Sequence, residues 1–205
     1  MISIGLTGNV GSGKSTVAAI WEKERGSLLI DADSIGRSVV RPGSRCLAAL
    51  TERFGEEILL PDGSLDRKKM AGIAFADKEN REALNSIVHP ELIREINNRL
   101  RDARSRDAKA VVVDAALIFE FGLNHCVDVV VAVDAPRETK IERMLAKGKM
   151  GREALERMLE VQISPKELKA RADHFLDNSA DQQSLKKNAL ELFDRLVCEE
   201  KKEAQ

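Results

Sequence analysis

The apolar residues of this chain gather in short continuous runs separated by longer amphipathic stretches. Clear runs cover residues 1–7, 27–30, 110–113 and 126–133, and a weaker run covers residues 174–176. Runs of this length without alternation are expected of strands that helices cover on both faces. Because helical patterns separate the runs, the sequence predicts an α/β fold with a doubly wound parallel sheet of about five strands.

Two helical stretches interrupt this alternation and predict inserted parts. Residues 34–105 carry no convincing core strand, and the expected long helix over 78–104 would kink before Pro90, which has no backbone N–H. Residues 136–165 are rich in arginine and lysine and contain Gly148 and Gly151 as flexing points. We therefore predict one domain over residues 1–205, with a core of about 1–33, 106–135 and 166–200, an acceptor-binding lobe of about 34–105 and a lid of about 136–165.

The first apolar run leads into a glycine-rich loop that fills the pattern G-x-x-x-x-G-K-[ST] and predicts a sheet of the P-loop NTPase type. A helical pattern follows over residues 15–21, which completes the strand–loop–helix context that such a loop requires. Backbone N–H groups can turn toward one anion there, and the helix N-terminus adds partial positive charge. Lys14 can reach the β- and γ-phosphates of a nucleotide, and the Ser15 hydroxyl can ligate Mg²⁺. The predicted nucleotide-binding residues are Gly8, Asn9, Val10, Gly11, Ser12, Gly13, Lys14, Ser15 and Thr16.

Polar side chains end the predicted strands on the same edge as this loop. Asp33, Asp114, Asp134 and Asn178 follow the later apolar runs in turn, and ligands bind at this edge of open α/β sheets. Asp33 is favoured over Asp31 as the base for an attacking hydroxyl, and its other interpretation is the N-cap of a helix over 34–40. Asp114 fits either an acidic residue near Mg²⁺ or a residue that ties its own loop.

Basic residues in the second helical stretch are candidates for contacting the transferring phosphoryl group. Arg143, Lys147, Lys149 and Arg152 are expected on neighbouring helical turns. There they form either a clamp on that group or an ordinary solvated face.

The inserted lobe holds two further candidates. Arg67 follows a turn, and His89 precedes Pro90 within a helical pattern. A lone histidine in a helical patch is more often structural than functional, so the residues alone leave its role open.

Composition excludes several classes of function. Charged residues make up 33% of the 205 residues with a formal net charge of −1, and the basic ones rarely alternate with aromatic ones, so we expect neither nucleic acid nor a membrane as a partner. No run approaches about 18 apolar residues, and we predict a cytoplasmic protein. Cys46, Cys126 and Cys198 lie far apart, which fits a reducing compartment and predicts three small buried side chains. The charged tail over residues 199–205 is expected to be solvated or frayed.

Taken in order, these segments resemble the dephospho-CoA kinase family over nearly the whole chain. The shared pieces beyond the glycine-rich loop include Asp31-Ala32-Asp33, Leu65-Asp66-Arg67, His89-Pro90, Phe119-Glu120, Gln162 and the stretch from Ala172-Asp173 to Asp177-Asn178. The resemblance implies a nucleotide-binding core, a helical CoA-binding lobe and a helical lid. It implies transfer of the γ-phosphoryl group of ATP, with Mg²⁺, to the ribose 3′-hydroxyl of dephospho-CoA, the last step of coenzyme A biosynthesis.

The resemblance also implies roles for individual residues. By this resemblance Lys14 binds the phosphates, Ser15 binds Mg²⁺ alone or with Thr16, and Asp33 is the base. The resemblance also implies that Arg67 and His89 lie on the acceptor side, Arg143 at the lid hinge and Asn178 near the adenine end.

The chain departs from the family pattern at three places. The Pro-Leu-Leu run usual after the third strand is absent, and Asp114 precedes Ala-Ala-Leu-Ile instead. Lys140 stands where glutamine is common, and Lys147 stands where the lid usually has arginine. Lysine lacks the planar fork of arginine, and one lost clamp contact could remove on the order of 2–4 kcal/mol of transition-state stabilisation unless Arg143 or Arg152 compensates.

Two other classes of function compete with this interpretation, because a phosphate-binding loop alone does not distinguish them. One is another P-loop small-molecule kinase, acting on a nucleoside monophosphate, shikimate or gluconate; the large insertion over residues 33–108 suits a bulkier acceptor. The other is a nucleotide-dependent switch. Residues 33–36 match D-x-x-G by letters, but no N-K-x-D motif follows a later strand. The sequence leaves the oligomeric state open.

Overall fold

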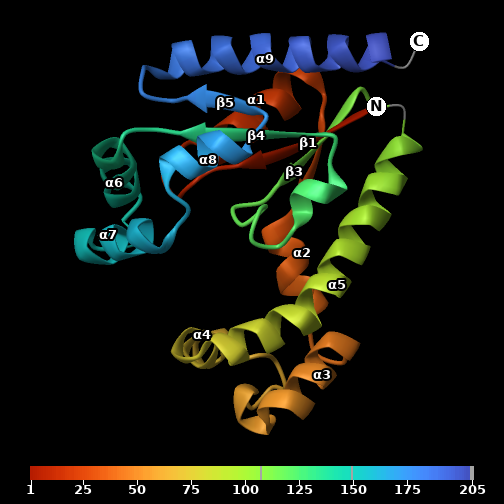
Figure 1. The fold of residues 1–205 in the computed structure, drawn as a ribbon, viewed down its shortest axis with the longest axis vertical. Helices are drawn as coiled ribbons and strands as arrows, with labels where there is room; N and C mark the ends of the chain where they lie inside the picture. The colour runs from red at the N-terminus through yellow and green to blue at the C-terminus, as the bar shows by residue number, and fades with distance from the viewer. Residues whose placement is uncertain (107, 149, 204–205) are drawn as a thin grey trace. The chain divides into compact units, whose positions relative to one another are not determined.

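The computed structural model describes residues 1–106, 108–148 and 150–203, and it contains a five-stranded sheet (Figure 1). The strands are β1 (Ile2–Thr7), β2 (Leu28–Asp31), β3 (Ala110–Asp114), β4 (Val129–Asp134) and β5 (His174–Asp177), in the order β2-β3-β1-β4-β5. β1 pairs in parallel with β3 and β4, and β4 pairs in parallel with β5. The predicted parallel sheet is confirmed, and the chain leaves β1 toward one edge and later continues toward the other, so the end of β1 lies at a topological switch point.

The fourth strand is shorter than its apolar run predicts. It begins at Val129 rather than at residue 126, because Leu123–Cys126 forms a 3-10 helix (η2) after Gly122. Gly122 adopts the left-handed conformation with φ 64°, which glycine tolerates without a steric penalty. Apolar character alone does not separate such a turn from the start of a strand.

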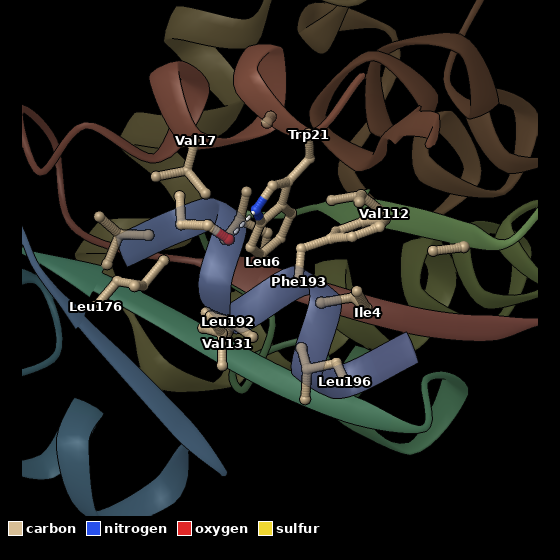
Figure 2. Close-up of a cluster of buried hydrophobic side chains, with 14 of the residues drawn as sticks. Ile4, Leu6, Val17, Trp21, Val112, Val131, Leu176, Leu192, Phe193 and Leu196 are labelled. Carbon is tan, nitrogen blue, oxygen red and sulfur yellow. Dashed lines mark hydrogen bonds between the residues drawn. The ribbon is translucent and has the colours of Figure 1, made fainter. Parts of the chain in front are cut away.

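Helices α1 (Lys14–Arg25) and α9 (Gln182–Glu203) share one hydrophobic core with the sheet (Figure 2). Trp21 is fully buried there, its ring centroid lies 5.6 Å from that of Phe193, and its Nε1 donates to the Ala189 carbonyl oxygen at 2.8 Å. Ile4 and Leu6 reach the same core from β1. Burial of these side chains holds α1 on the sheet, and this places the start of α1 beside the end of β1.

Two predictions about the outer parts of the chain are only partly confirmed. The tail expected to be solvated or frayed is helical as far as Glu203 rather than frayed, while Glu199 is exposed as a solvated tail requires. The amino group of Met1 contacts Glu200 Oε1 at 2.6 Å. Of the three cysteines, Cys46 is buried as predicted, whereas Cys126 is partly exposed and Cys198 is exposed on α9. The residue type alone does not show whether a cysteine lies on the buried or the exposed face of a helix.

The chain divides into two compact units, residues Met1–Ile30 with Leu100–Gln205, and residues Asp31–Arg99. The second unit contains α2 (Ala32–Val39), α3 (Arg45–Phe54), the 3-10 helix η1 (Glu56–Ile58), α4 (Arg67–Ala76) and most of α5 (Lys78–Arg104). Its core includes Leu50, Ile58 and Met70. That residues of about 34–105 bind an acceptor remains a prediction.

The long helix predicted over residues 78–104 is confirmed as α5, and Pro90 lies inside it. Between β2 and β3, the residues that the structure describes form no strand beyond an isolated antiparallel bridge of Leu59 with Leu65. This bridge brackets the turn that Pro61, Asp62 and Gly63 predict.

The basic stretch after β4 forms α6 (Arg137–Ala146) and α7 (Arg152–Val161), and α8 (Pro165–Arg171) follows. Ile141, Leu155 and Leu159 make a small core between α6 and α7. Val10 of the glycine-rich loop packs against this core, so this helical segment is connected to the loop by apolar contact.

Candidate active site

The glycine-rich loop turns tightly between β1 and α1, and two of its glycines have little space around them. Gly13 has φ 99°, and a Cβ built on it would lie 2.1 Å from Asn178 Nδ2. Gly11 has φ 77°, and a Cβ on it would lie 2.5 Å from the Lys140 carbonyl oxygen. Neither position accepts a side chain, because the backbone conformation and the neighbours both exclude one. The loop therefore has the tightly turned, closely packed form that a phosphate-binding loop needs.

Lys14, the first residue of α1, forms an ion pair with Asp114 at the end of β3. The two side chains are 13% and 15% exposed, so the pair is largely screened from water. The structure thus brings together two residues that the sequence placed on the same edge. Ser15 follows Lys14 and is exposed at the start of the helix, where its hydroxyl is open to a ligand.

Two residues at the end of α7 contact the loop. Gln162 Oε1 accepts from the Val10 backbone N–H at 3.1 Å, and the Ile163 carbonyl oxygen accepts from Asn9 Nδ2 at 3.0 Å. Asn9 is buried despite its polar side chain, because this bond satisfies it. Sequence reasoning did not assign Gln162 to the site; its position beside a loop 152 residues earlier in the chain needs the tertiary structure.

Arg143 and Asn178, two predicted site residues, meet beside the loop. Arg143 Nη2 donates to the Asn178 carbonyl oxygen at 3.1 Å and to its Oδ1 at 3.3 Å. Asn178 Nδ2 in turn donates to the Ser12 carbonyl oxygen at 2.7 Å. The contacts form one connected path from α6 through Asn178 to the glycine-rich loop.

The other basic candidates do not share one helix. Lys147 is the exposed C-cap of α6, Arg152 begins α7, and Lys149 lies outside the described residues. Arg143 and Lys147 lie one turn apart at the end of α6, as expected, but the expectation is wrong for Arg152, since Gly148 adopts φ 66° and follows the end of α6. Arg152 Nη2 pairs with Glu138 Oε1 at 2.6 Å on the surface. That contact raises the pKa of Arg152 and lowers the pKa of Glu138.

Asp134 and Lys140 form a buried ion pair that sequence reasoning missed. Lys140 Nζ lies 2.7 Å from Asp134 Oδ1, and the two side chains are 3% and 9% exposed. The sequence signal was weak, because a lysine in a basic helical stretch predicts a solvated side chain. The pair anchors α6 to the end of β4 next to the glycine-rich loop, whose Gly11 packs on the Lys140 backbone.

The remaining candidates belong to the unit formed by Asp31–Arg99. Asp31, not Asp33, is the N-cap of α2, because its Oδ1 accepts from the Ser34 N–H at 2.8 Å. The capping interpretation of Asp33 is therefore wrong, and Asp33 lies in the first turn of a helix that begins at Ala32. Arg67 begins α4 and donates from Nη2 to the Arg37 carbonyl oxygen at 3.1 Å.

His89 lies within α5 in the same unit. Burial lowers the pKa of His89 below its usual value, which favours the neutral ring.

Comparison with known proteins decides which of the phosphate-binding families applies. The sequence profile of dephospho-CoA kinases matches residues 2–184. A dephospho-CoA kinase of Corynebacterium efficiens is 41% identical over 200 residues, which cover 97% of this chain and 97% of the relative. One from Geobacter sulfurreducens is 38% identical over 190 residues, 93% of this chain and 96% of the relative. This chain belongs to the dephospho-CoA kinase family.

Solved structures agree with this membership at the level of the fold. The structure of TT1252 from Thermus thermophilus matches with a TM-score of 0.79 and 30% identity, covering 95% of this chain and 97% of that one. Dephospho-CoA kinase from Campylobacter jejuni gives a TM-score of 0.71 at 23% identity, covering 97% and 98%. A shikimate kinase from Acinetobacter baumannii reaches a TM-score of only 0.52 at 16% identity, covering 97% and 94%, which shows a shared fold and no more.

Two side chains beside the glycine-rich loop of this dephospho-CoA kinase family member are of the type that could ligate a Mg²⁺ ion bound together with a nucleotide. The Ser15 hydroxyl and the Asp114 carboxylate are hard oxygen donors at one end of the loop, the type of ligand that Mg²⁺ prefers. Among the described residues, no group of three or more His, Cys, Asp or Glu side chains could hold a metal ion alone. Phosphate oxygens would have to complete the coordination.

Within the same described ranges, no helix has the length and apolar character needed to cross a membrane.

Proposed function

We propose that this chain transfers the γ-phosphoryl group of ATP to the ribose 3′-hydroxyl of dephospho-CoA, giving coenzyme A and ADP in the last step of coenzyme A biosynthesis. The observation that carries the proposal is the match of nearly the whole chain to dephospho-CoA kinases, combined with an intact phosphate-binding loop. Three free cysteines suit a reducing compartment, and we place the reaction in the cytoplasm.

Phosphoryl transfer asks the protein mainly to position groups and to neutralise charge. Lys14 supplies a positive charge at the start of α1, and its partner Asp114 keeps that charge stabilised at the end of β3. Backbone N–H groups of the loop and the N-terminus of α1 hold the phosphates. Mg²⁺, when bound through Ser15 and phosphate oxygens, would neutralise negative charge on the β- and γ-phosphates.

Asp33 is the proposed base. It accepts the proton of the acceptor hydroxyl, the acceptor oxygen forms a bond to the γ-phosphorus, and the bond from that phosphorus to the β-phosphate oxygen breaks to release ADP. Asp31 is occupied as the N-cap of α2, which supports Asp33 for this role. Arg67 and His89 are proposed to bind the acceptor.

Arg143 and Lys147 are proposed to stabilise the charge of the transferring group. Arg143 is already oriented by Asn178, whereas Lys147 ends α6 and is exposed. Arg143 therefore has the better support for this role. Asn178 follows β5, in the region proposed for the adenine.

An acceptor panel tests the proposed function. ADP release from Mg-ATP is measured with dephospho-CoA, AMP, CMP, shikimate, gluconate and no acceptor. We expect dephospho-CoA alone to accelerate release strongly, with a product heavier by one phosphoryl group. Equal release with every acceptor, or stimulation by shikimate, gluconate or a nucleoside monophosphate instead, would overturn the proposal.

A further inference from the structure

Asn178 makes four hydrogen bonds to three different parts of the first unit. It follows β5 directly and is 4% exposed. Its backbone N–H donates to the Asp134 carbonyl oxygen at 2.7 Å, at the end of β4. Its Nδ2 donates to the Ser12 carbonyl oxygen at 2.7 Å, and its carbonyl oxygen and Oδ1 accept from Arg143 at 3.1 and 3.3 Å. One buried amide thus joins the sheet edge, the phosphate-binding loop and α6.

The bond to Ser12 sets the orientation of a loop peptide. A trans peptide is planar, and its C=O and N–H point in opposite directions. Since the Ser12 carbonyl is fixed on Asn178, the N–H of Gly13 points away from Asn178. Gly13 packs on the same amide, because a Cβ there would lie 2.1 Å from Nδ2. Asn178 therefore fixes the direction of a backbone donor directly before Lys14.

The bonds to Arg143 orient a second donor. Both acceptor atoms of Asn178 hold Nη2 of the guanidinium. Nη1 of the same group is buried and has no hydrogen-bond partner among the residues that the structure describes. A buried guanidinium nitrogen without a partner is costly unless a ligand binds it. The planar fork means that fixing one nitrogen also fixes the other.

We propose that Asn178 is a positioning residue that sets the Gly13 N–H and the Arg143 guanidinium together for the phosphates of the nucleotide. The inference deepens the proposed phosphoryl transfer and rests on it for the identity of the ligand. The inference gives Asn178 a role in addition to its proposed position near the adenine, because Asn178 orients the groups that bind phosphate through the loop and through Arg143. A change confined to its side chain then weakens phosphate binding at both donors.

The sharpest variant is Asn178→Asp, which keeps the shape and both acceptors for Arg143 but removes the donor to Ser12. An ionised carboxylate would face the Ser12 carbonyl oxygen, whereas a protonated carboxyl group could donate to it. We expect the Kd for Mg-ATP, measured by titration calorimetry, to rise about tenfold or more over the wild type at pH 8.

Asn188→Asp is the matched control, since Asn188 is exposed on α9 and the same substitution there should leave the Kd unchanged. Asn178→Ala removes every side-chain contact without adding charge and should weaken Mg-ATP binding by about tenfold at every pH. Wild-type affinity in both Asn178 variants would overturn the proposal. Failure of both variants to unfold cooperatively would show a folding residue and also overturn it.

Mg-ATP affinity requires no acceptor, so this test is separate from that of the proposed function. A wild-type chain that binds Mg-ATP but does not phosphorylate dephospho-CoA would contradict the proposed function. The dependence of Mg-ATP affinity on Asn178 would still decide the role of this residue.

Discussion

Asp31 and Asp33 are two residues apart, yet they hold different positions in α2. Asp31 caps α2 through the Ser34 N–H, and Asp33 lies in the first helical turn. The sequence pattern Asp-Ala-Asp could not separate them, because either aspartate could begin the helix. The difference in task becomes a difference in the expected effects of substitution.

Asp33→Asn should lower kcat by about 100-fold or more, since an amide cannot accept the proton of the acceptor hydroxyl. Its free energy of unfolding should stay within about 0.5 kcal/mol of the wild type. Asp31→Ala should instead lose about 1 kcal/mol of stability, because the cap of α2 is removed. Steady-state kinetics and urea unfolding of both variants test this, and unchanged kcat in Asp33→Asn would rule Asp33 out as the base.

Asp114 is expected to contribute to Mg²⁺ binding in addition to its ion pair with Lys14. Asp114→Asn keeps an acceptor of the same shape for Lys14 but loses the charge that attracts the ion. We expect the Mg²⁺ concentration for half-maximal activity to rise several-fold, while maximal activity at saturating Mg²⁺ falls less. The exposed Asp102→Asn serves as a control that should match the wild type. An unchanged Mg²⁺ dependence in Asp114→Asn would leave Asp114 as a partner of Lys14 alone.

At the scale of elements, α5 contains a histidine whose charged form is disfavoured. Burial lowers the pKa of His89 from 6.5, so the folded state binds its proton less readily than the unfolded state does. The stability linked to His89 is therefore fully present above about pH 6.5 and is lost as the pH falls through the folded pKa.

His89→Gln removes this titration, and the stability of the variant should decline less than that of the wild type between pH 7.5 and 5.5. Urea unfolding at several pH values measures the difference. His125→Gln is a control for a histidine on another element. Parallel curves for the wild type and His89→Gln would show that His89 does not contribute to the acid sensitivity.

The sequence predicted the elements that repeat a simple physical pattern. Continuous apolar runs indicated all five strands, and the long helix around Pro90 was predicted at its observed limits. It failed where local conformation decided the element. Gly122 turns the start of the fourth apolar run into η2, and Gly148 ends α6 before the predicted helical face is complete.

At the scale of the whole molecule, the glycine-rich loop could be predicted from its sequence motif, but the residues that contact the loop and hold its conformation could not. The contacts of Ser12 with Asn178 and of Val10 with Gln162 join positions more than 150 residues apart. Lys140 drew notice only as a departure from the family pattern, yet it is buried against Asp134, and only the packed structure shows that a partner compensates its charge. Residues that hold other residues in place have no sequence pattern of their own.

The position of the phosphate added to dephospho-CoA tests the central claim most directly. Purified protein is incubated with Mg-ATP and dephospho-CoA, and the product is analysed by mass spectrometry and phosphorus NMR, with Lys14→Ala in parallel. We predict one new phosphomonoester on the ribose 3′-oxygen and at least about 100-fold less product from Lys14→Ala. A phosphate at another position, or equal product from Lys14→Ala, would contradict the account.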